Sequence, residues 1–487
     1  MRNEGKFRIL SQPEVERIHE EALRVLERTG VYFDCDEALD VLEAAGASVN
    51  RATSVVRFPR QLVMDAIKLA PSEIQLHDRE GNPSVLLGGD RVHFDPGSSG
   101  VRFMESDGVT VRESRAEDLK KIVQVTDALP HIELQSTAVV ANDVPKEIAD
   151  SYRLYIVLSH SKKPIITGAF SVDGLFDMKE LLSAVAGGDE ALAKKPRAVF
   201  DICPSPPLKW THISARNIMD CAKLGLPMEF VSMPMPGAAS PATIAGSVVI
   251  HTAETLSGTT LAQLVKPGAA VVWGGAPVVF DMRSGTTPMS AVEATMIGCA
   301  STQMGKFYGL PTHTYTCLSD SKCNDAQAGL ETAMGAVMGA LAGINVISGP
   351  GMLDFVGTMS LEKLVIDNEI CGLILRLLRG IDVTDDTLAT DLIVELGPGG
   401  DYLNTKHTRQ WFKKEVYIPG PAIDRKDRKT WEAQGFTTSE QRARKVVAEI
   451  LKQKELEGPC DAKLLLDEAM KAVKKRAGAD NLPLGPK

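Results

Sequence analysis

The stretch MEFVSMPMPG, residues 228–237, is a short apolar run that ends in prolines and a glycine, as buried β-strands commonly do. A helical stretch follows it. This stretch begins at Ser240-Pro241, a good capping pair, and ends before Lys266-Pro-Gly268. The apolar run AAVVWGG, residues 269–275, comes next. Together these segments predict one strand–helix–strand unit of a parallel sheet.

The same unit repeats along the chain. Seven apolar runs, each ended by turn or small polar residues, recur every 30 to 42 residues, which is the length of a strand plus a helix. The runs begin at Ile132, Ile165, Ala198, Met228, Ala269, Pro311 and Ile344. The repeat predicts an α/β fold of the (β/α)8 TIM-barrel type. We expect the missing eighth strand between Gly380 and Tyr402 or beyond.

An open, doubly wound sheet is the competing fold. No GxGxxG dinucleotide fingerprint follows the first run, so the barrel is favoured. The expected parts are an N-terminal extension of helices and a β-hairpin (1–115), the barrel (116–415) and a C-terminal helical tail (416–487). Ser11 and Glu14 form a capping box that opens the extension. The amphipathic stretches Ser439–Gln453 and Asp461–Lys475 predict helices docked on the outside of the barrel.

Composition limits the possible partners. With 44% hydrophobic residues, the 487-residue chain can bury a large core. Its 63 acidic and 54 basic residues give a net charge of −9, which argues against nucleic acid as a partner. No apolar stretch predicts a secretion signal or a membrane span. Eight cysteines without a CxxC pair are typical of reduced, buried thiols. We expect a cytoplasmic protein that binds no membrane.

In a TIM barrel the active site lies at the carboxyl ends of the strands. Here these ends contain no carboxylate pair, Ser-His-Asp set, lysine or phosphate-binding loop, and they are instead rich in aromatic, Met, Pro and Gly residues. Such a rim suits a cationic alkyl ligand, because aromatic faces attract quaternary ammonium. The aromatic candidates are Phe170, Trp273, Tyr315 and Phe355. For Trp273, Tyr315 and Phe355 the alternative is that the rings only plug the top of the barrel.

Three polar residues are also candidates for substrate binding, and each has an alternative structural role. Arg283 would bind a substrate carboxylate, or form a surface pair with Asp281. His313 would bind the carboxylate, lie in the core, or join Cys317 in a zinc site. Asp320 would contact the substrate or cap the helix that follows it.

Several long segments resemble the trimethylamine methyltransferase superfamily. They are Ser319-Asp-Ser-Lys-Cys-Asn-Asp-Ala-Gln-Ala-Gly329, Ser348-Gly-Pro-Gly-Met352, Ser360-Leu-Glu-Lys-Leu-Val-Ile-Asp367, Gly397-Pro-Gly-Gly-Asp-Tyr-Leu403 and His407-Thr408. The likeness covers nearly the whole chain and implies a TIM barrel that moves a methyl group from an amine to the cobalt of a separate corrinoid protein. This chain has only standard residues, so it resembles the branch without pyrrolysine, whose substrates are quaternary amines such as glycine betaine, proline betaine and carnitine.

A quaternary nitrogen leaves as a neutral amine, so the reaction needs no acid–base residue and depends on positioning in a dry cage. We expect glycine betaine as substrate, with Trp273, Tyr315 and Phe355 around its ammonium group and Arg283 or His313 at its carboxylate. The chain itself is expected to hold no cofactor or metal, because the corrinoid protein supplies the cobalt. A betaine-binding regulator and a zinc- or cysteine-dependent enzyme are the alternatives. We also expect a homo-oligomer, with the small-residue helix Ala326–Gly343 as one possible contact.

Overall fold

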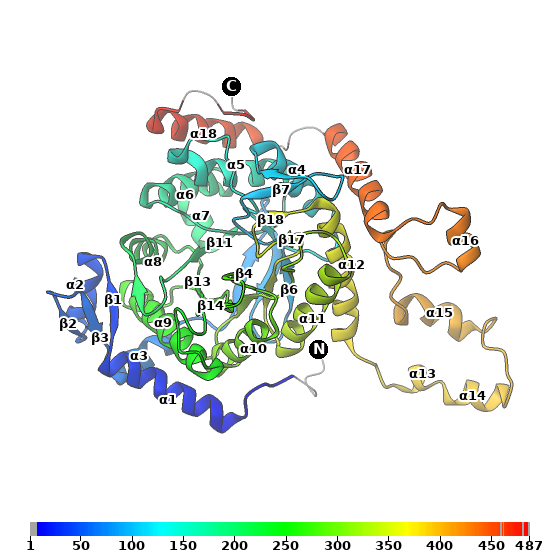
Figure 1. Ribbon diagram of the computed structural model, residues 1–487, viewed down its shortest axis with the longest axis horizontal. Helices are drawn as coiled ribbons and strands as arrows, with labels where there is room; N and C mark the ends of the chain where they lie inside the picture. The colour runs from blue at the N-terminus through cyan, green and yellow to red at the C-terminus, as the bar shows by residue number, and fades with distance from the viewer. Residues whose placement is uncertain (1–6, 458–459, 461, 480–481, 486–487) are drawn as a thin grey trace.

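The computed structural model describes residues 7–457, 460, 462–479 and 482–485. Its centre is a closed barrel of eight parallel strands (Figure 1). In order around the barrel the strands are β6 (His93–Asp95), β9 (Gln135–Ser136), β10 (Ile165–Thr167), β11 (Ala198–Ile202), β13 (Met228–Ser232), β14 (Val271–Gly275), β15 (His313–Tyr315) and β16 (Val346–Ser348). A bridge between Trp273 and Thr312 joins β14 to β15, and the amides of Glu133 and Leu134 donate to the Phe94 carbonyl, both at 3.1 Å, which closes the barrel between β9 and β6.

The eighth strand is β6, and its predicted position after Gly380 was wrong. It precedes the seven apolar runs, pairs in parallel with β16, and lies within the range 1–115 that the sequence assigned to the extension. The strand has only three residues, and His93 and Asp95 flank its one apolar residue, Phe94. Such a short polar strand leaves no apolar run in the sequence.

A helix follows each barrel strand, which confirms the predicted strand–helix alternation and the fold class. The ring of helices consists of α4 (Ala116–Ala128), α5 (Ala149–His160), α6 (Val172–Ala186), α8 (His212–Leu224), α9 (Ile244–Val265), α10 (Val292–Phe307), α11 (Ala326–Ala342) and α12 (Leu361–Arg379). Ser360 caps α12 by accepting a 3.2 Å hydrogen bond from the Lys363 amide. The helix expected from Ser240 begins at Ile244 instead, because Pro236 and Ser240 close a tight turn.

A small β-hairpin closes the amino-terminal end of the barrel. It consists of β4 (Ile74–His77) and β5 (Pro83–Leu87). Its four buried apolar side chains pack against the first inward layer of the barrel, which is Leu134, Ile166, Val199, Val272 and Val346. This end of the barrel is therefore plugged by apolar side chains.

The remaining N-terminal elements pack beside the barrel. They are α1 (Gln12–Arg28), α2 (Asp36–Ala44), α3 (Arg60–Leu69), β1 (Val31–Phe33), β2 (Ser48–Asn50) and β3 (Val55–Arg57). Helices α1 and α3 pack on α9, and β12 (Lys209–Trp210) joins the small sheet. At the opposite end of the barrel, β7 (Arg102–Met104) and β8 (Val111–Glu113) form a hairpin that pairs with β18 (Thr358–Met359) and, through it, with β17 (Met352–Leu353).

The C-terminal helices dock on the outside of the barrel, as predicted. Helix α17 (Ser439–Glu457) packs against α12 and α4, and α18 (Lys463–Ala477) packs against α5 and α6. Asp461, the expected start of the last helix, lies outside the described residues. No helix in the described part of the chain combines the length and hydropathy that crossing a bilayer requires.

Between the barrel and α17 the chain forms an extended arm, residues 381–438 (Figure 1). The arm consists of α13 (Asp385–Leu388), α14 (Thr390–Leu396), α15 (Lys406–Glu415), α16 (Arg428–Ala433) and their connections. None of these four helices has a buried residue. The arm therefore has little core of its own.

Candidate active site

The inside of the barrel has a polar layer above its apolar floor. Glu229 on β13 pairs with Nδ1 of His313 on β15, and Nε2 of His313 lies 2.6 Å from the Ser348 hydroxyl on β16. Ser348 in turn donates to Asp95 on β6. When Asp95 is ionised, Ser348 donates its single proton to Asp95 and Nε2 of His313 is the donor to Ser348. One chain of hydrogen bonds thus connects four strands across the barrel.

Burial determines how this polar layer is charged. Desolvation raises the pKa of Asp95 to about 7 and raises that of Glu229 well above its usual range. The same burial lowers the pKa of His313, although the neighbouring carboxyl groups oppose this shift. Gly274 makes room for the layer, since a Cβ there would lie 2.3 Å from Oε1 of Glu229.

Above the polar layer lies a cavity of about 580 Å³, within the size range of small-molecule sites. It occupies the carboxyl ends of the strands, where active sites of this architecture form. Its lining is mostly apolar, aromatic or small: Ser98, Ser99, Val101, Thr137, Gly168, Ala169, Phe170, Asp201, Ile202, Cys203, Thr211, Ile213, Ser214, Asn217, Val231, Met233, Ala276, Met289, Tyr315, Phe355, Val356 and Gly357. None of these lining residues is a lysine, an arginine or a histidine.

Three of the predicted aromatic residues line this cavity. Tyr315 is buried and its hydroxyl lies 2.6 Å from that of Ser98. Phe170 lies at the mouth, 57% exposed, with the Arg153 guanidinium carbon 4.8 Å from its ring centre. Phe355 belongs to a tight turn in which Asp354, Phe355 and Val356 all have positive φ angles, a conformation that disfavours side chains and is often found near functional sites.

Trp273, the fourth predicted aromatic residue, does not join them. Its neighbours Gly274 and Ala276 face the barrel interior and the cavity, so the alternation of a strand turns Trp273 outward. There its ring packs 5.1 Å from Tyr308 and 5.8 Å from His251, between the barrel and its helices. The expected cage of Trp273, Tyr315 and Phe355 is therefore not formed, and Tyr315 and Phe355 remain.

The predicted polar residues lie outside the cavity lining. The Arg283 side chain is 91% exposed and binds Asp281 through Nη2 at 2.8 Å, which is the surface-pair alternative. His313 is fully buried in the polar layer. Asp320 accepts hydrogen bonds from the amides of Met289 and Ser290, both at 3.1 Å, and so holds the loop that brings Met289 to the cavity. The helix cap of α11 is Asp325.

Cys317 and His313 do not form a shared site. Cys317 packs outside the barrel wall, with Cys371 and apolar residues of α11 and α12, whereas His313 points inward. Among the described residues, no group of three or more His, Cys, Asp or Glu side chains is arranged to hold a metal ion. The geometry thus gives no support to a zinc site at these two residues.

Asp201 is the cavity residue that the sequence analysis missed. It lies on β11 in register with Glu229, and its Oδ1 has no hydrogen-bond partner among the described residues. Burial first, and then the nearby Glu229 and Asp95, raise its pKa well above its usual range. Its position within the apolar run AVFDI was the available signal, because a carboxyl group inside a barrel strand is costly to bury.

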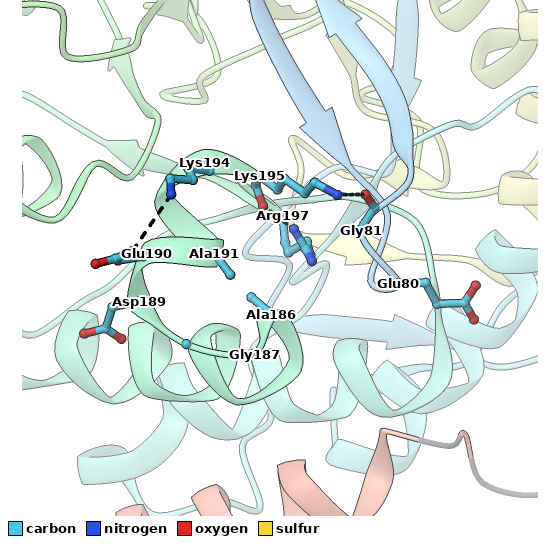
Figure 2. A pocket seen from close by; sticks show the side chains of 11 residues that line it. Glu80, Gly81, Ala186, Gly187, Asp189, Glu190, Ala191, Lys194, Lys195 and Arg197 are labelled. Carbon is cyan, nitrogen blue, oxygen red and sulfur yellow. Dashed lines mark hydrogen bonds and ion pairs between the residues drawn. The ribbon is translucent and has the colours of Figure 1, made fainter.

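A second cavity, of about 750 Å³, lies at the opposite end of the barrel, between the hairpin β4–β5 and the turn that joins α6 to α7 (Asp189–Lys194) (Figure 2). Its charged side chains are mostly engaged: Lys194 lies 3.8 Å from Glu190, and Lys195 donates to the Gly81 carbonyl at 3.2 Å. It lies away from the carboxyl ends of the strands and has no aromatic lining residue. The cavity above the polar layer is therefore the candidate active site.

The family model for trimethylamine methyltransferase (MTTB) matches residues 1–477 of this chain. The chain belongs to the MTTB family. The trimethylamine methyltransferase MttB of Desulfitobacterium hafniense (strain DSM 10664 / DCB-2) is 33% identical over 444 residues, covering 91% of this chain and 88% of that protein. The glycine betaine methyltransferase of D. hafniense (strain Y51) is 33% identical over 437 residues, covering 89% and 90%.

Among solved structures, the monomethylamine methyltransferase MtmB of Methanosarcina barkeri superimposes with a TM-score of 0.55 at 14% identity, covering 98% of this chain and 90% of that one. At this identity the match supports the fold alone. The MTTB family membership identifies the protein as a methyltransferase.

Proposed function

We propose that this MTTB-family protein transfers a methyl group from a quaternary amine to the Co(I) centre of a separate corrinoid protein. The observation that supports this most is the aromatic and methionine-lined cavity at the carboxyl ends of the barrel strands, which contains a carboxyl group and no basic side chain in its lining. Aromatic faces and a carboxylate both attract an alkylated cationic nitrogen.

The reaction needs little acid–base chemistry from the protein. The cobalt electron pair attacks the methyl carbon, the carbon–nitrogen bond breaks, and its electrons remain on nitrogen, which leaves as a neutral tertiary amine. The protein's part is to orient the substrate and exclude water. Tyr315, Phe355 and Phe170 would hold the methyl groups, and the packed polar layer beneath them would keep the floor of the cavity rigid.

The mouth of the cavity suits a docking protein. Phe170, Ile213 and Val101 line the cavity and are also 57%, 40% and 46% exposed, so an apolar rim surrounds the opening. A corrinoid domain placed there would bring its cobalt above the substrate. The corrinoid would be held by that partner, and this chain would supply only the substrate site.

The test is a methyl-transfer assay with purified protein, a Co(I) corrinoid protein and a panel of amines. With at least one quaternary amine, we expect the absorption spectrum of the corrinoid to change from that of reduced cobalt to that of methylated cobalt. The matching tertiary amine should appear as product. A Tyr315→Ala/Phe355→Ala double variant should lose most of this rate. Binding of amines without methylation of any corrinoid protein would favour the alternative of a binding or regulatory barrel.

The sequence predicted glycine betaine as the donor, with proline betaine and carnitine as alternatives. All three carry a carboxylate, for which Arg283 and His313 were the expected partners. Neither residue reaches the cavity, because Arg283 is a surface residue and His313 is buried below it. The panel should therefore include quaternary amines with and without a carboxylate.

We also propose that the chain forms homo-oligomers through the arm. Ile381, Val394, Leu403, Ile418 and Phe436 each expose more than half of their surface. Every charged residue from Asp382 to Asp401 is acidic, whereas Lys406 to Lys414 contains only basic ones. The acidic segment of one arm would thus complement the basic segment of a second copy in a two-fold contact. Helix α11 instead packs its small residues against α10 and α12.

A further inference from the structure

The candidate active site has an unusual balance of charge. Asp201 is the one lining residue with a carboxyl group, and no described lining residue carries a positive charge. Glu229 and Asp95 lie in the layer below together with His313, so most of the titratable groups in that layer are acidic. A ligand that enters this cavity therefore meets acidic groups from one side and aromatic faces from the others.

Two basic side chains, Arg153 and Lys322, lie over aromatic rings of the cavity but are not themselves part of its lining. Arg153 is fully buried behind the lining, donates to the Thr137 carbonyl at 3.2 Å and lies 3.6 Å from Asp150. Lys322 lies over the Phe355 ring, with Nζ 3.9 Å from the ring centre, donates to the Asp320 carbonyl at 2.7 Å and is 63% exposed. A substrate carboxylate inside the cavity would find neither of them in the lining, and burying it without a partner is costly.

Asp201 itself lacks a partner. Its Oδ1 is buried and has no hydrogen-bond donor within reach among the described residues, although most buried carboxyl oxygens have one. The side chain lines the cavity beside Tyr315 and Gly168. An unpartnered carboxyl oxygen on the wall of a ligand cavity indicates that the ligand completes its interactions.

We propose that Asp201 is the counter-ion for the substrate's cationic nitrogen, and that the substrate is a net-positive alkylammonium ion without a carboxylate group. This inference rests on the proposed function and specifies its substrate class. Choline and tetramethylammonium belong to this class, whereas glycine betaine, which is neutral overall, does not. The carboxylate pairs with the nitrogen while the aromatic rings pack against the methyl groups.

Isothermal titration calorimetry of the full chain tests the proposal. We expect tetramethylammonium and choline to bind at least about tenfold more tightly than glycine betaine, and Asp201→Asn to weaken both cations about tenfold or more. Asn has the same shape as a protonated Asp, so the variant should fold; circular dichroism and a thermal melt check this. The matched control is Asp281→Asn, which removes a surface carboxylate and should leave both affinities unchanged.

Equal or tighter binding of glycine betaine, or unchanged cation binding in Asp201→Asn, would overturn the proposal. If glycine betaine binds and Lys322→Ala abolishes that binding, the loop lysine is the carboxylate partner and the proposal also fails. The methyl-transfer assay distinguishes a failure of this inference from a failure of the proposed function. Methyl transfer from glycine betaine, but not from the net-positive amines, would refute this inference and keep the proposed function. Cation binding that depends on Asp201, without any methyl transfer, would keep this inference and refute the proposed reaction.

Discussion

At the carboxyl end of β11, Asp201 sits where its protonation should change with the ligand. Burial, Glu229 on β13 and Asp95 on β6 raise its pKa in the free protein, while His313 on β15 opposes this. Tyr315 on β15 and Cys203, which directly follows β11, lie near it, and burial first and then Asp201 raise the pKa of both. In the free protein the carboxyl group therefore keeps its proton at a pH where an exposed aspartate is ionised.

Binding of a cation favours the ionised carboxylate, so it should release a proton. We expect the affinity for tetramethylammonium, which has no titratable group, to rise with pH and then level off as the pH passes the free-protein pKa of Asp201. Titrations over a pH range that spans both the rise and the levelling-off, in buffers of different ionisation enthalpy, measure both the slope and the proton release. The Asp201→Asn variant should give a flat profile, and a falling affinity would contradict this assignment.

The aromatic residues offer a second test at this scale. Replacing Phe355 by Leu keeps an apolar side chain but removes the ring, and should weaken cation binding by about 0.5–2 kcal/mol, or roughly 2- to 30-fold. Trp273→Phe is the matched control, because its ring lies outside the cavity and the change should affect stability more than affinity. A larger loss of affinity in the Trp273 variant would show that the placement of the two rings is wrong.

At the scale of elements, a buried ion pair fastens α12 to the loop after β16. Nζ of Lys363 lies 2.6 Å from Asp367 and 2.8 Å from the Thr332 hydroxyl, and Asp367 accepts a hydrogen bond from the Gly351 amide at 2.7 Å. Both charged side chains are only 2% exposed. These contacts link two of the segments that resemble the family, Ser348–Met352 and Ser360–Asp367.

Lys363→Met should be strongly destabilising, by about 3–5 kcal/mol, because it leaves the Asp367 carboxylate buried without its cation. The midpoint of urea denaturation measures this effect. The control is Arg428→Met, which breaks an exposed pair with Glu432 and should change stability by less than about 0.5 kcal/mol. Similar midpoints for the two variants would contradict the role of the buried pair.

The lengths and sequences of the strands explain which features of the fold could be predicted from the sequence. The strand–helix repeat could be predicted because each of the seven barrel strands other than β6 begins at, or within a few residues after, the start of an apolar run. The residues that face the barrel interior could not be predicted, because strands of a parallel barrel are largely apolar on both sides. A shift of one residue along β14 is enough to move Trp273 from the interior to the outside. Strand β6 escaped detection because its inward residue, Asp95, belongs to the polar layer. Arg283 was misplaced because exposure of a loop side chain depends on tertiary packing alone.

On the scale of the whole molecule, the arm is the part of the structure that most needs a partner. Its helices are held by few internal contacts, and its apolar side chains face outward. The acidic and basic segments of the arm fit the same two segments in a second copy of the chain. If the arm instead binds a different protein, the purified chain would be monomeric.

Light scattering coupled to size-exclusion chromatography measures the oligomeric state and so tests the role of the arm. We expect an oligomer that dissociates, at least in part, when Val394 and Leu403, 75% and 76% exposed, are both replaced by Glu. Leu456→Glu/Leu464→Glu is the matched control, since these residues are 82% and 77% exposed but lie on α17 and α18. A monomeric parent protein, or an assembly that the arm variant leaves intact, would refute the proposal.

The hairpin β4–β5 has a consequence for the order of events in catalysis. Because it plugs the amino-terminal end of the barrel, the candidate active site does not continue through the barrel and opens at the carboxyl ends of the strands. A protein acceptor that docks on that opening would cover it. The small amine must then enter before the acceptor arrives, and its demethylated product must wait until the acceptor departs. Initial-rate measurements should therefore show a compulsory-order ternary complex, with excess acceptor protein inhibiting turnover.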